Sequence, residues 1–256
     1  MNTKMSDEKA TSFIKKINNY WINERAKDKA RPFWEQSAYH IGNLAAFDLT
    51  QEPQYLSFTK QWCEENQWKS HPFEVPVDDW TWGYGEEETK SALFGDWHAC
   101  YQVYLMMLER TSVDEATVMR NILSVTDYQV SKLEDSFWWW ADGLFMGMPL
   151  MVLLYKKTKN TLYLTKMHEY FMFAMELMYD GENGIPTSSK GYSSSAYDGG
   201  PYGGKKAIDS YFSDPDNYQH LFYRDANYVS PANPLPNELA PTKNFWARGN
   251  GWVFAV

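Results

Sequence analysis

The stretch WWWADGLFMGMPLMVLLYKKTKNTLYLTKMHEYFMFAMELMYDGENG, residues 138–184, contains two apolar segments with the periodicity of helices. It predicts a core helix from about residue 144 and an amphipathic helix over 161–179, because apolar residues recur there at helical spacing. Turn residues at 180–184 end the second helix. Two successive helices are typical of a helical hairpin, so this stretch indicates an all-α fold.

The same pattern continues on both sides of this hairpin. Apolar stripes predict further helices over 8–25, 34–49, 54–66, 96–109 and 114–132, and the beginning of another at 246–256. Residues 71–85 should form a loop, and 185–242, rich in Gly, Ser, Pro, Tyr and Asp, a long functional loop with one short hairpin. Paired helices with long, aromatic connections predict an α/α toroid. No linker divides the chain, so we expect one domain over residues 1–256.

Composition limits the function classes. Aromatic residues make up 17% of the chain and include 12 Trp, more than an ordinary core needs, and flat indole faces suit sugar rings. The net charge of −9 argues against nucleic acid and against an anionic membrane surface, since both require clustered Lys and Arg. Cys63 and Cys100 form neither a disulfide framework nor a metal-ligand spacing. We therefore expect a saccharide as the partner, while the oligomeric state stays open.

Targeting, membrane and cofactor signals are weak. The N-terminus lacks a signal-peptide pattern, which favours a cytoplasmic location, or a periplasmic one if a leader has been removed. The apolar run 137–155 is interrupted and too short to span a bilayer. The histidines show no metal spacing, and residues 199–206 only imitate a phosphate-binding loop, because the required Ser or Thr is missing. No metal and no cofactor is predicted.

Two aspartates stand in unusual surroundings. Asp142 follows three tryptophans and precedes the core helix, so desolvation should raise its pKa and allow it to act as a general acid near neutral pH. Asp96, in Phe-Gly-Asp96-Trp-His, is the second candidate. Either residue could instead be a helix N-cap.

The last motif, Asn244-Phe-Trp246-Ala-Arg248-Gly-Asn-Gly-Trp252, places an arginine between two tryptophans. Its guanidinium group could bind a carboxylate, and the indoles could form walls for a ring. The alternative is an arginine stacked on surface tryptophans.

Four motifs together resemble glycoside hydrolase family 105, the unsaturated rhamnogalacturonyl hydrolases, and their relatives the unsaturated glucuronyl hydrolases. They are the residues around Asp96, Trp140-Ala-Asp142-Gly-Leu-Phe-Met, Leu221-Phe-Tyr-Arg-Asp225 and Trp246-Ala-Arg248-Gly-Asn-Gly-Trp252. The resemblance extends from about residue 10 to the end of the sequence. It implies an (α/α)6 barrel and a substrate left by a polysaccharide lyase, an oligosaccharide with a Δ4,5-unsaturated uronic acid at its non-reducing end.

The resemblance also implies roles for individual residues. Asp142 would protonate C4 of the vinyl ether and help a water molecule to add at C5, after which the hemiketal collapses and releases the shortened saccharide. Asp96 would orient the substrate and support the protonation of Asp142. This chemistry differs from the usual protonation of the glycosidic oxygen. Substrate-contacting positions would be Trp140, Trp246, Arg248, Trp252 and Tyr39.

Two departures from the family pattern matter. Relatives often have histidine where this chain has Arg224, which suggests a more anionic sugar, such as a sulfated one. Family members are also longer, so we expect either a fragment that lacks about four helices or a ring closed by a partner. The alternatives to the hydrolase are another toroid enzyme, such as a uronate lyase, and an inactive saccharide-binding fragment.

Overall fold

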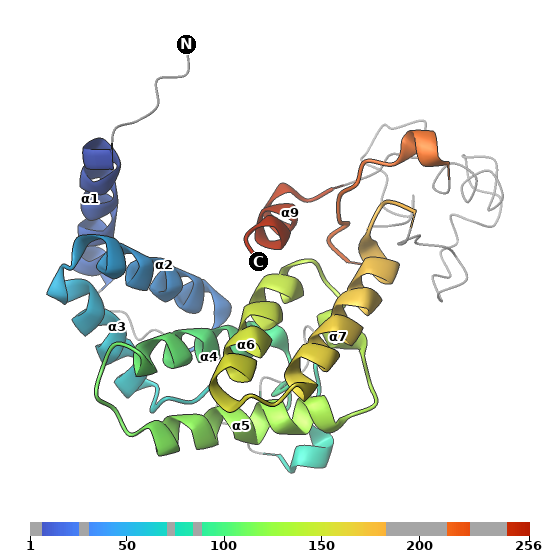
Figure 1. The fold of residues 1–256 in the computed structure, drawn as a ribbon, viewed down its shortest axis with the longest axis horizontal. Coiled ribbons are helices and arrows are strands. Elements are labelled where there is room, and N and C mark those ends of the chain that lie inside the picture. Colours follow the sequence, from blue (N-terminus) through green and yellow to red (C-terminus); the bar gives the residue numbers. More distant parts are fainter. Residues whose placement is uncertain (1–6, 26–30, 71–74, 84–88, 183–213, 226–244) are drawn as a thin grey trace. The chain divides into compact units, whose positions relative to one another are not determined.

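The computed structural model describes residues 7–25, 31–70, 75–83, 89–182, 214–225 and 245–256. Within these ranges the regular structure is helical: eight α-helices and three short 3-10 helices, with no β-strand beyond two isolated bridges (Figure 1). The chain divides into two compact units, residues 1–129 and 130–256. The expected single domain stays a prediction.

The first unit is built from five helices: α1 (Asp7–Arg25), α2 (Trp34–Thr50), α3 (Pro53–Glu65), α4 (Gly95–Leu108) and most of α5 (Glu115–Ser131). Helix α2 packs against α1, α3 and α4. Nearly every side chain of α4 is buried, from Gly95 to Met107, as expected for a helix that is apolar all round. Helix α4 is therefore the core element of this unit.

A buried polar network joins α1, α2 and α3. The Asn43 amide donates to Thr59 Oγ1 at 2.8 Å and to the Tyr55 carbonyl at 2.6 Å, and it accepts from Asn18 Nδ2. The His40 Nδ1 lies 2.9 Å from the Thr59 hydroxyl, and burial lowers the pKa of His40 to about 3. Because these buried groups are paired with one another, the three helices can bury them without leaving hydrogen bonds unmade.

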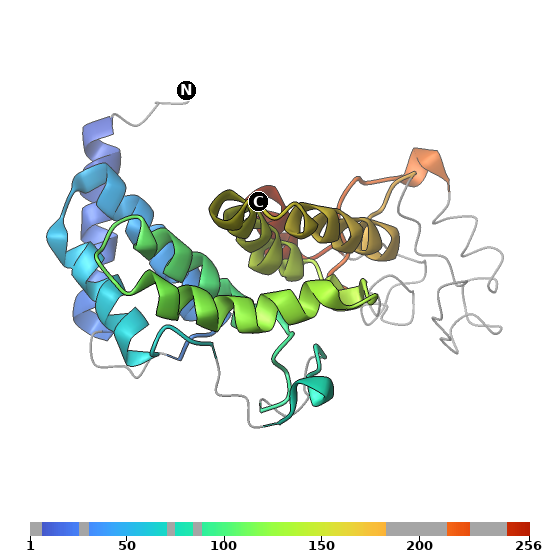
Figure 2. The same cartoon turned by 60° about the horizontal axis from the view of Figure 1, so that its bottom comes forward.

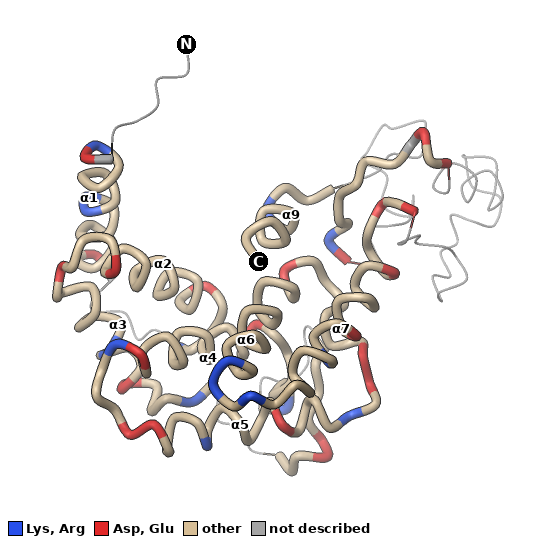
Figure 3. The backbone as a smooth tube through the Cα atoms, viewed as in Figure 1, with Lys and Arg blue, Asp and Glu red and all other residues tan. Residues whose placement is uncertain are grey.

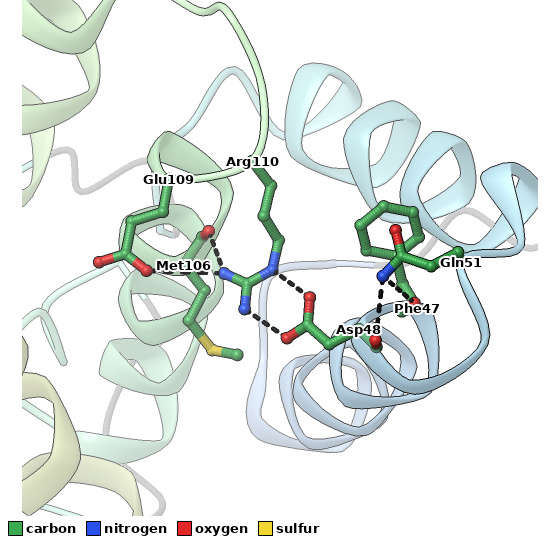
Figure 4. A network of polar contacts seen from close by, with 6 residues as sticks. All are labelled: Phe47, Asp48, Gln51, Met106, Glu109 and Arg110. Atoms are coloured by element: carbon green, nitrogen blue, oxygen red, sulfur yellow. Dashed lines mark hydrogen bonds and ion pairs between the residues drawn. The ribbon is translucent and has the colours of Figure 1, made fainter.

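An arginine fork also connects the end of α4 with α2 (Figure 4). Arg110 Nε donates to Asp48 Oδ1 at 3.0 Å and Nη2 to Asp48 Oδ2 at 2.5 Å, while Nη1 donates to the Met106 carbonyl. The hydrogen bonds from Arg110 lower the pKa of Asp48. Two parallel bonds of this kind fix direction as well as distance.

The second unit contains the hairpin that the sequence predicted. After η2 (Ser136–Trp138), α6 (Asp142–Thr158) and α7 (Leu162–Met178) pack side by side, and α9 (Ala247–Phe254) packs on α6 (Figures 1 and 2). The connection between α6 and α7 turns at Lys159, which takes the left-handed conformation. A short helix η4 (Pro215–Asn217) precedes the segment 218–225, which forms no helix and includes His220 in the left-handed conformation.

One glycine determines how α6 is covered. A Cβ atom added at Gly147 would lie 2.4 Å from Cε2 and Nε1 of Trp138, and this indole is fully buried. The tryptophan ring therefore lies directly on the backbone of α6 at Gly147. Any residue with a side chain at this position would clash with the ring.

The predicted helices agree with the observed ones to within two residues at each end, including the helix of the Trp246 motif, which covers Ala247–Phe254. The core helix begins at Asp142 rather than near residue 144, and the Gly143 N–H already donates to the Trp140 carbonyl three residues earlier. The phosphate-loop imitation at 199–206 and most of the loop at 185–242 lie outside the described residues. Among the described helices, none combines the length and the apolar character needed to cross a bilayer.

Candidate active site

Asp142 is the first residue of α6, and Ala141 occupies the N-cap position before it. The alternative that Asp142 is the N-cap is therefore wrong. Its Oδ1 atom is buried and has no hydrogen-bond partner in the described part of the chain. A buried carboxyl oxygen without a partner is unusual, because an unmade hydrogen bond is costly, and such groups gather at functional sites.

Burial raises the pKa of Asp142 to about 6, although the positive charges of Arg248 and Arg224 act in the opposite direction. Desolvation dominates because the carboxylate loses water without gaining a hydrogen bond to its charged form. About half of the Asp142 carboxyl groups are consequently protonated at pH 6 and about a tenth at pH 7, far more than for an ordinary aspartate, as a general acid requires.

The first turn of α9 lies against the start of α6. A Cβ atom added at Gly249 would lie 3.0 Å from the Trp246 ring, 3.3 Å from the Ala141 Cβ and 3.6 Å from Asp142 Oδ1. The Arg248 guanidinium lies over the Trp246 ring, with its Cζ 4.0 Å from the centroid. Stacking on an indole restricts the orientation of a guanidinium group, because the two planar groups lie against each other.

The segment 221–225 lies next to the residues that directly precede α6. The Ala141 N–H donates to the Arg224 carbonyl at 2.7 Å, and Trp140 forms an antiparallel bridge with Asp225. Arg224 pairs with the buried Asp225 at 3.0 Å, and its Cζ lies 5.6 Å from the Trp246 centroid. Two guanidinium groups therefore lie near one indole, and both lower the pKa of the adjacent acid.

The two remaining tryptophans of the predicted site have different surroundings. Trp140 is 5% exposed and packs on Gly143 and Trp139, so little of its ring is open to a ligand. Trp252 is half-buried and lies 4.5 Å from Phe145, centroid to centroid. The second unit thus brings together six of the eight predicted site residues: Trp140, Asp142, Arg224, Trp246, Arg248 and Trp252.

Asp225 and Asn250 are two buried polar residues of this region that the sequence did not single out for a role. Both fall inside quoted motifs, and Asn250 contacts the backbone of Phe222, 28 residues away. The only signal for them was a polar residue among Gly and aromatic neighbours.

Asp96 and Tyr39 belong to the first unit. Asp96 is 7% exposed and is the second residue of α4, whose N-cap is Phe94, so the N-cap alternative is wrong here too. Tyr39 stacks on Trp21 at 4.6 Å and donates its hydroxyl to Asn18 Oδ1, and burial raises its pKa. The roles of both residues stay predictions.

No group of three or more His, Cys, Asp or Glu side chains with the geometry for a metal ion is found among the described residues. His98 uses Nε2 to contact the Ala92 carbonyl at 2.9 Å, and Cys100 donates to the Trp97 carbonyl. Both side chains are thus committed to backbone groups.

Comparison with known proteins settles the family. The sequence model of glycosyl hydrolase family 88 matches residues 5–196, more than half of the chain. The chain belongs to glycosyl hydrolase family 88. This confirms the broader group expected from the motifs around Asp96 and Asp142, and it places the chain among glycoside hydrolases.

Two curated relatives of this family 88 chain share a name, unsaturated 3S-rhamnoglycuronyl hydrolase. The protein from Alteromonas sp. (strain LOR) is 25% identical over 254 residues, 91% of this chain. The protein from Formosa agariphila is 24% identical over 236 residues, 86% of this chain. The chain spans 48% of the length of each.

Two solved structures are similar to the family 88 chain. One, titled a polysaccharide lyase, has a TM-score of 0.73 and 35% identity, and the match covers 96% of this chain and 57% of that one. The other, a glycosyl hydrolase of family 88 from Bacteroides vulgatus, has a TM-score of 0.70 and 29% identity, with 96% and 59% covered. These likenesses confirm the expected fold class, the all-α (α/α)6 toroid.

Proposed function

We propose that this chain carries the acid site of a hydrolase that removes a Δ4,5-unsaturated uronic acid from the non-reducing end of lyase-generated oligosaccharides. One observation carries the proposal: Asp142 has a buried, unpartnered carboxyl oxygen and a pKa raised to about 6, beside two arginines. The relatives named unsaturated 3S-rhamnoglycuronyl hydrolase support it. Of the two related activities, we favour that of the unsaturated rhamnogalacturonyl hydrolases over that of the unsaturated glucuronyl hydrolases, on the Trp140–Met146 and Trp246–Trp252 motifs.

The chemistry requires an acid that is still protonated near neutral pH. The proton of Asp142 goes to C4 of the C4=C5 double bond, and positive charge develops at C5, where the ring oxygen shares it. A water molecule then adds at C5 and returns a proton to the Asp142 carboxylate, so the acid is regenerated. The resulting hemiketal opens, and the glycosidic bond at C1 breaks to release the shortened saccharide.

Recognition of the uronate carboxylate falls to the arginines. Arg248 is exposed and stacked on Trp246, so its N–H donors can form a charge-assisted pair with a carboxylate. A bound substrate carboxylate would in turn offset the lowering effect of Arg248 on the pKa of Asp142. Binding and acid strength are therefore coupled through one guanidinium group.

Arg224 would bind a second anionic group on the saccharide. About a third of the Arg224 side chain is exposed, although one of its nitrogens already pairs with Asp225. The relatives carry "3S-rhamnoglycuronyl" in their names. We therefore expect an acidic, sulfated saccharide to be a better substrate than an unsulfated one, with Asp96 and Tyr39 as further contacts.

The test follows the absorbance of the double bond. The chain is incubated with lyase-generated unsaturated disaccharides, sulfated and unsulfated, and the ultraviolet absorbance of the conjugated C4=C5 bond is recorded. Wild type should remove the absorbance, and Asp142→Asn should reduce the rate at least about a hundredfold, because the proton donor is gone. Decay at the same rate in Asp142→Asn would exclude Asp142 as the acid.

A lyase is the second candidate, because the solved structure with 35% identity is titled a polysaccharide lyase. A lyase forms the double bond by β-elimination, so absorbance would rise on an intact uronate polysaccharide instead of falling on a cut one. Elimination also needs a base, whereas Asp142, with a pKa of about 6, is still about half protonated at pH 6. The sign of the absorbance change therefore separates the two activities.

A further inference from the structure

Asn250 is a buried polar residue of α9 that no step of the proposed reaction uses. It is 6% exposed, and its amide forms two hydrogen bonds with the backbone of Phe222. Oδ1 accepts from the Phe222 N–H and Nδ2 donates to the Phe222 carbonyl, each at 2.8 Å. The same Nδ2 also donates to the Trp246 carbonyl at 3.1 Å. The amide thus replaces the partner strand that this piece of extended chain lacks on that side.

This contact lies inside a short chain of links between the candidate site residues. Arg248 is two residues before Asn250 on α9. Arg224 is two residues after Phe222, and its carbonyl accepts from the Ala141 N–H at 2.7 Å, directly before Asp142. Helix α9, the 221–225 segment and the start of α6 are therefore connected through backbone hydrogen bonds and one side chain.

We propose that Asn250 is a positioning residue, which sets where Arg248 and Arg224 lie relative to Asp142 by holding the 221–225 segment to α9. The proposal rests on the proposed function for its catalytic consequence, but its geometric content does not. An amide is required because it offers a donor and an acceptor at the same end of the side chain. Aspartate keeps only the acceptor, and leucine keeps neither.

Loss of this contact should not unfold the unit. The segment is also held on its other edge by the end of α7: the Tyr223 N–H donates to the Met178 carbonyl at 2.9 Å, and the Asp180 N–H donates to the Leu221 carbonyl at 2.9 Å. These bonds remain in an Asn250 variant. The predicted change is a looser fit between the segment and α9, rather than loss of the fold.

The experiment compares Asn250→Leu and Asn250→Asp with a matched control, Asn121→Leu. In the control, an amide that donates to the Gln67 and Trp68 carbonyls of the first unit is lost. Two readouts are taken: kcat and KM on the unsaturated disaccharide, and the titration of the Asp142 carboxyl carbon by NMR. A merely structural role would lower the melting temperature of all three variants and move neither readout.

Both Asn250 variants should lose roughly tenfold to a hundredfold in kcat/KM, mainly through KM, because misplaced arginines bind the uronate poorly. The titration midpoint of Asp142 should move upward as its positive neighbours recede. A folded Asn250→Leu protein with wild-type kcat/KM and an unchanged Asp142 midpoint would overturn the proposal; should that variant not fold, the same criterion applies to Asn250→Asp. If wild type removes no double bond, the proposed function fails, and the NMR comparison alone decides the role of Asn250.

Discussion

At the scale of single residues, Asp142 is set apart by what its carboxyl group lacks. Many acidic side chains of this chain face water, and Asp48 gains the Arg110 fork, which lowers its pKa. Asp142 gains no hydrogen bond at Oδ1, so desolvation outweighs the attraction of two arginines and its pKa rises. Two guanidinium groups near a carboxylate would ordinarily lower its pKa. Here the effect of burial is larger than that of both arginines, so the pKa of Asp142 rises.

The first residue-scale prediction concerns the pH dependence of activity. Since the protonated form of Asp142 is the active one, kcat/KM should fall about tenfold per pH unit above roughly pH 6. Removing Arg248 removes a charge that lowers the pKa of Asp142, so in Arg248→Gln this fall should begin at higher pH, although KM is raised. The pH–rate profile checks both statements, with Arg120→Gln on exposed α5 surface as the control. A fall that begins at the same pH in Arg248→Gln would show that the arginine does not act on the acid.

The second residue-scale prediction concerns stability. A carboxyl with a raised pKa in the folded state favours folding below about pH 4, and this contribution is lost as pH rises through about 6. Asp142→Asn has no such charge to bury, so it should be more stable than wild type at pH 7 by about 1–2 kcal/mol, a figure reduced for the part of the carboxyl in water. The difference should vanish near pH 4. Urea unfolding at both pH values measures it, and Asp216→Asn, at an exposed carboxylate, serves as control.

At the scale of elements, replacing two helical glycines by alanine should change stability in opposite directions. Gly147 of α6 supports the buried Trp138 indole, whereas a Cβ at Gly42 of α2 would meet nothing within 4 Å. Gly147→Ala should therefore cost about 1–3 kcal/mol by overpacking, and Gly42→Ala should gain up to about 1 kcal/mol because alanine favours the helix. Midpoints of urea unfolding report both changes. Equal stability of Gly147→Ala and wild type would mean that the tryptophan can move aside.

The elements also show how far sequence reasoning reaches. Apolar periodicity located the helices well, because most of them bury one face along their own length and the pattern is local. The start of α6 was placed too late, since Gly143 does not break a helix whose first turn is packed under Trp140. Asp142 and Arg248 could be proposed from their neighbours. The Asn250 contact could not, because its partner Phe222 is 28 residues away and carries no side-chain signal for the pairing.

At the scale of the whole molecule, the negative net charge of the chain opposes the binding of an anionic substrate at the proposed site. The chain has a net charge of −9, and acidic residues are spread along the helices of both units (Figure 3), yet the proposed substrate is an anion. Long-range repulsion must therefore be overcome by short-range contacts with Arg248 and Arg224. The two effects differ in range, so salt can separate them: the Debye length shortens from about 30 Å at 0.01 M to about 10 Å at 0.1 M.

Raising the ionic strength over that interval should increase kcat/KM for the unsaturated uronide by up to about threefold, because screening removes the distant repulsion before it weakens a stacked, close arginine–carboxylate pair. Arg248→Gln should have a lower kcat/KM but the same relative increase, since the net charge changes by only one unit. The methyl ester of the substrate, which lacks the charge, should show no salt dependence. A steady decrease of kcat/KM with salt for the free acid would instead mean that the arginines already attract the substrate from a distance, and that the field at the site is positive in spite of the acidic chain around it.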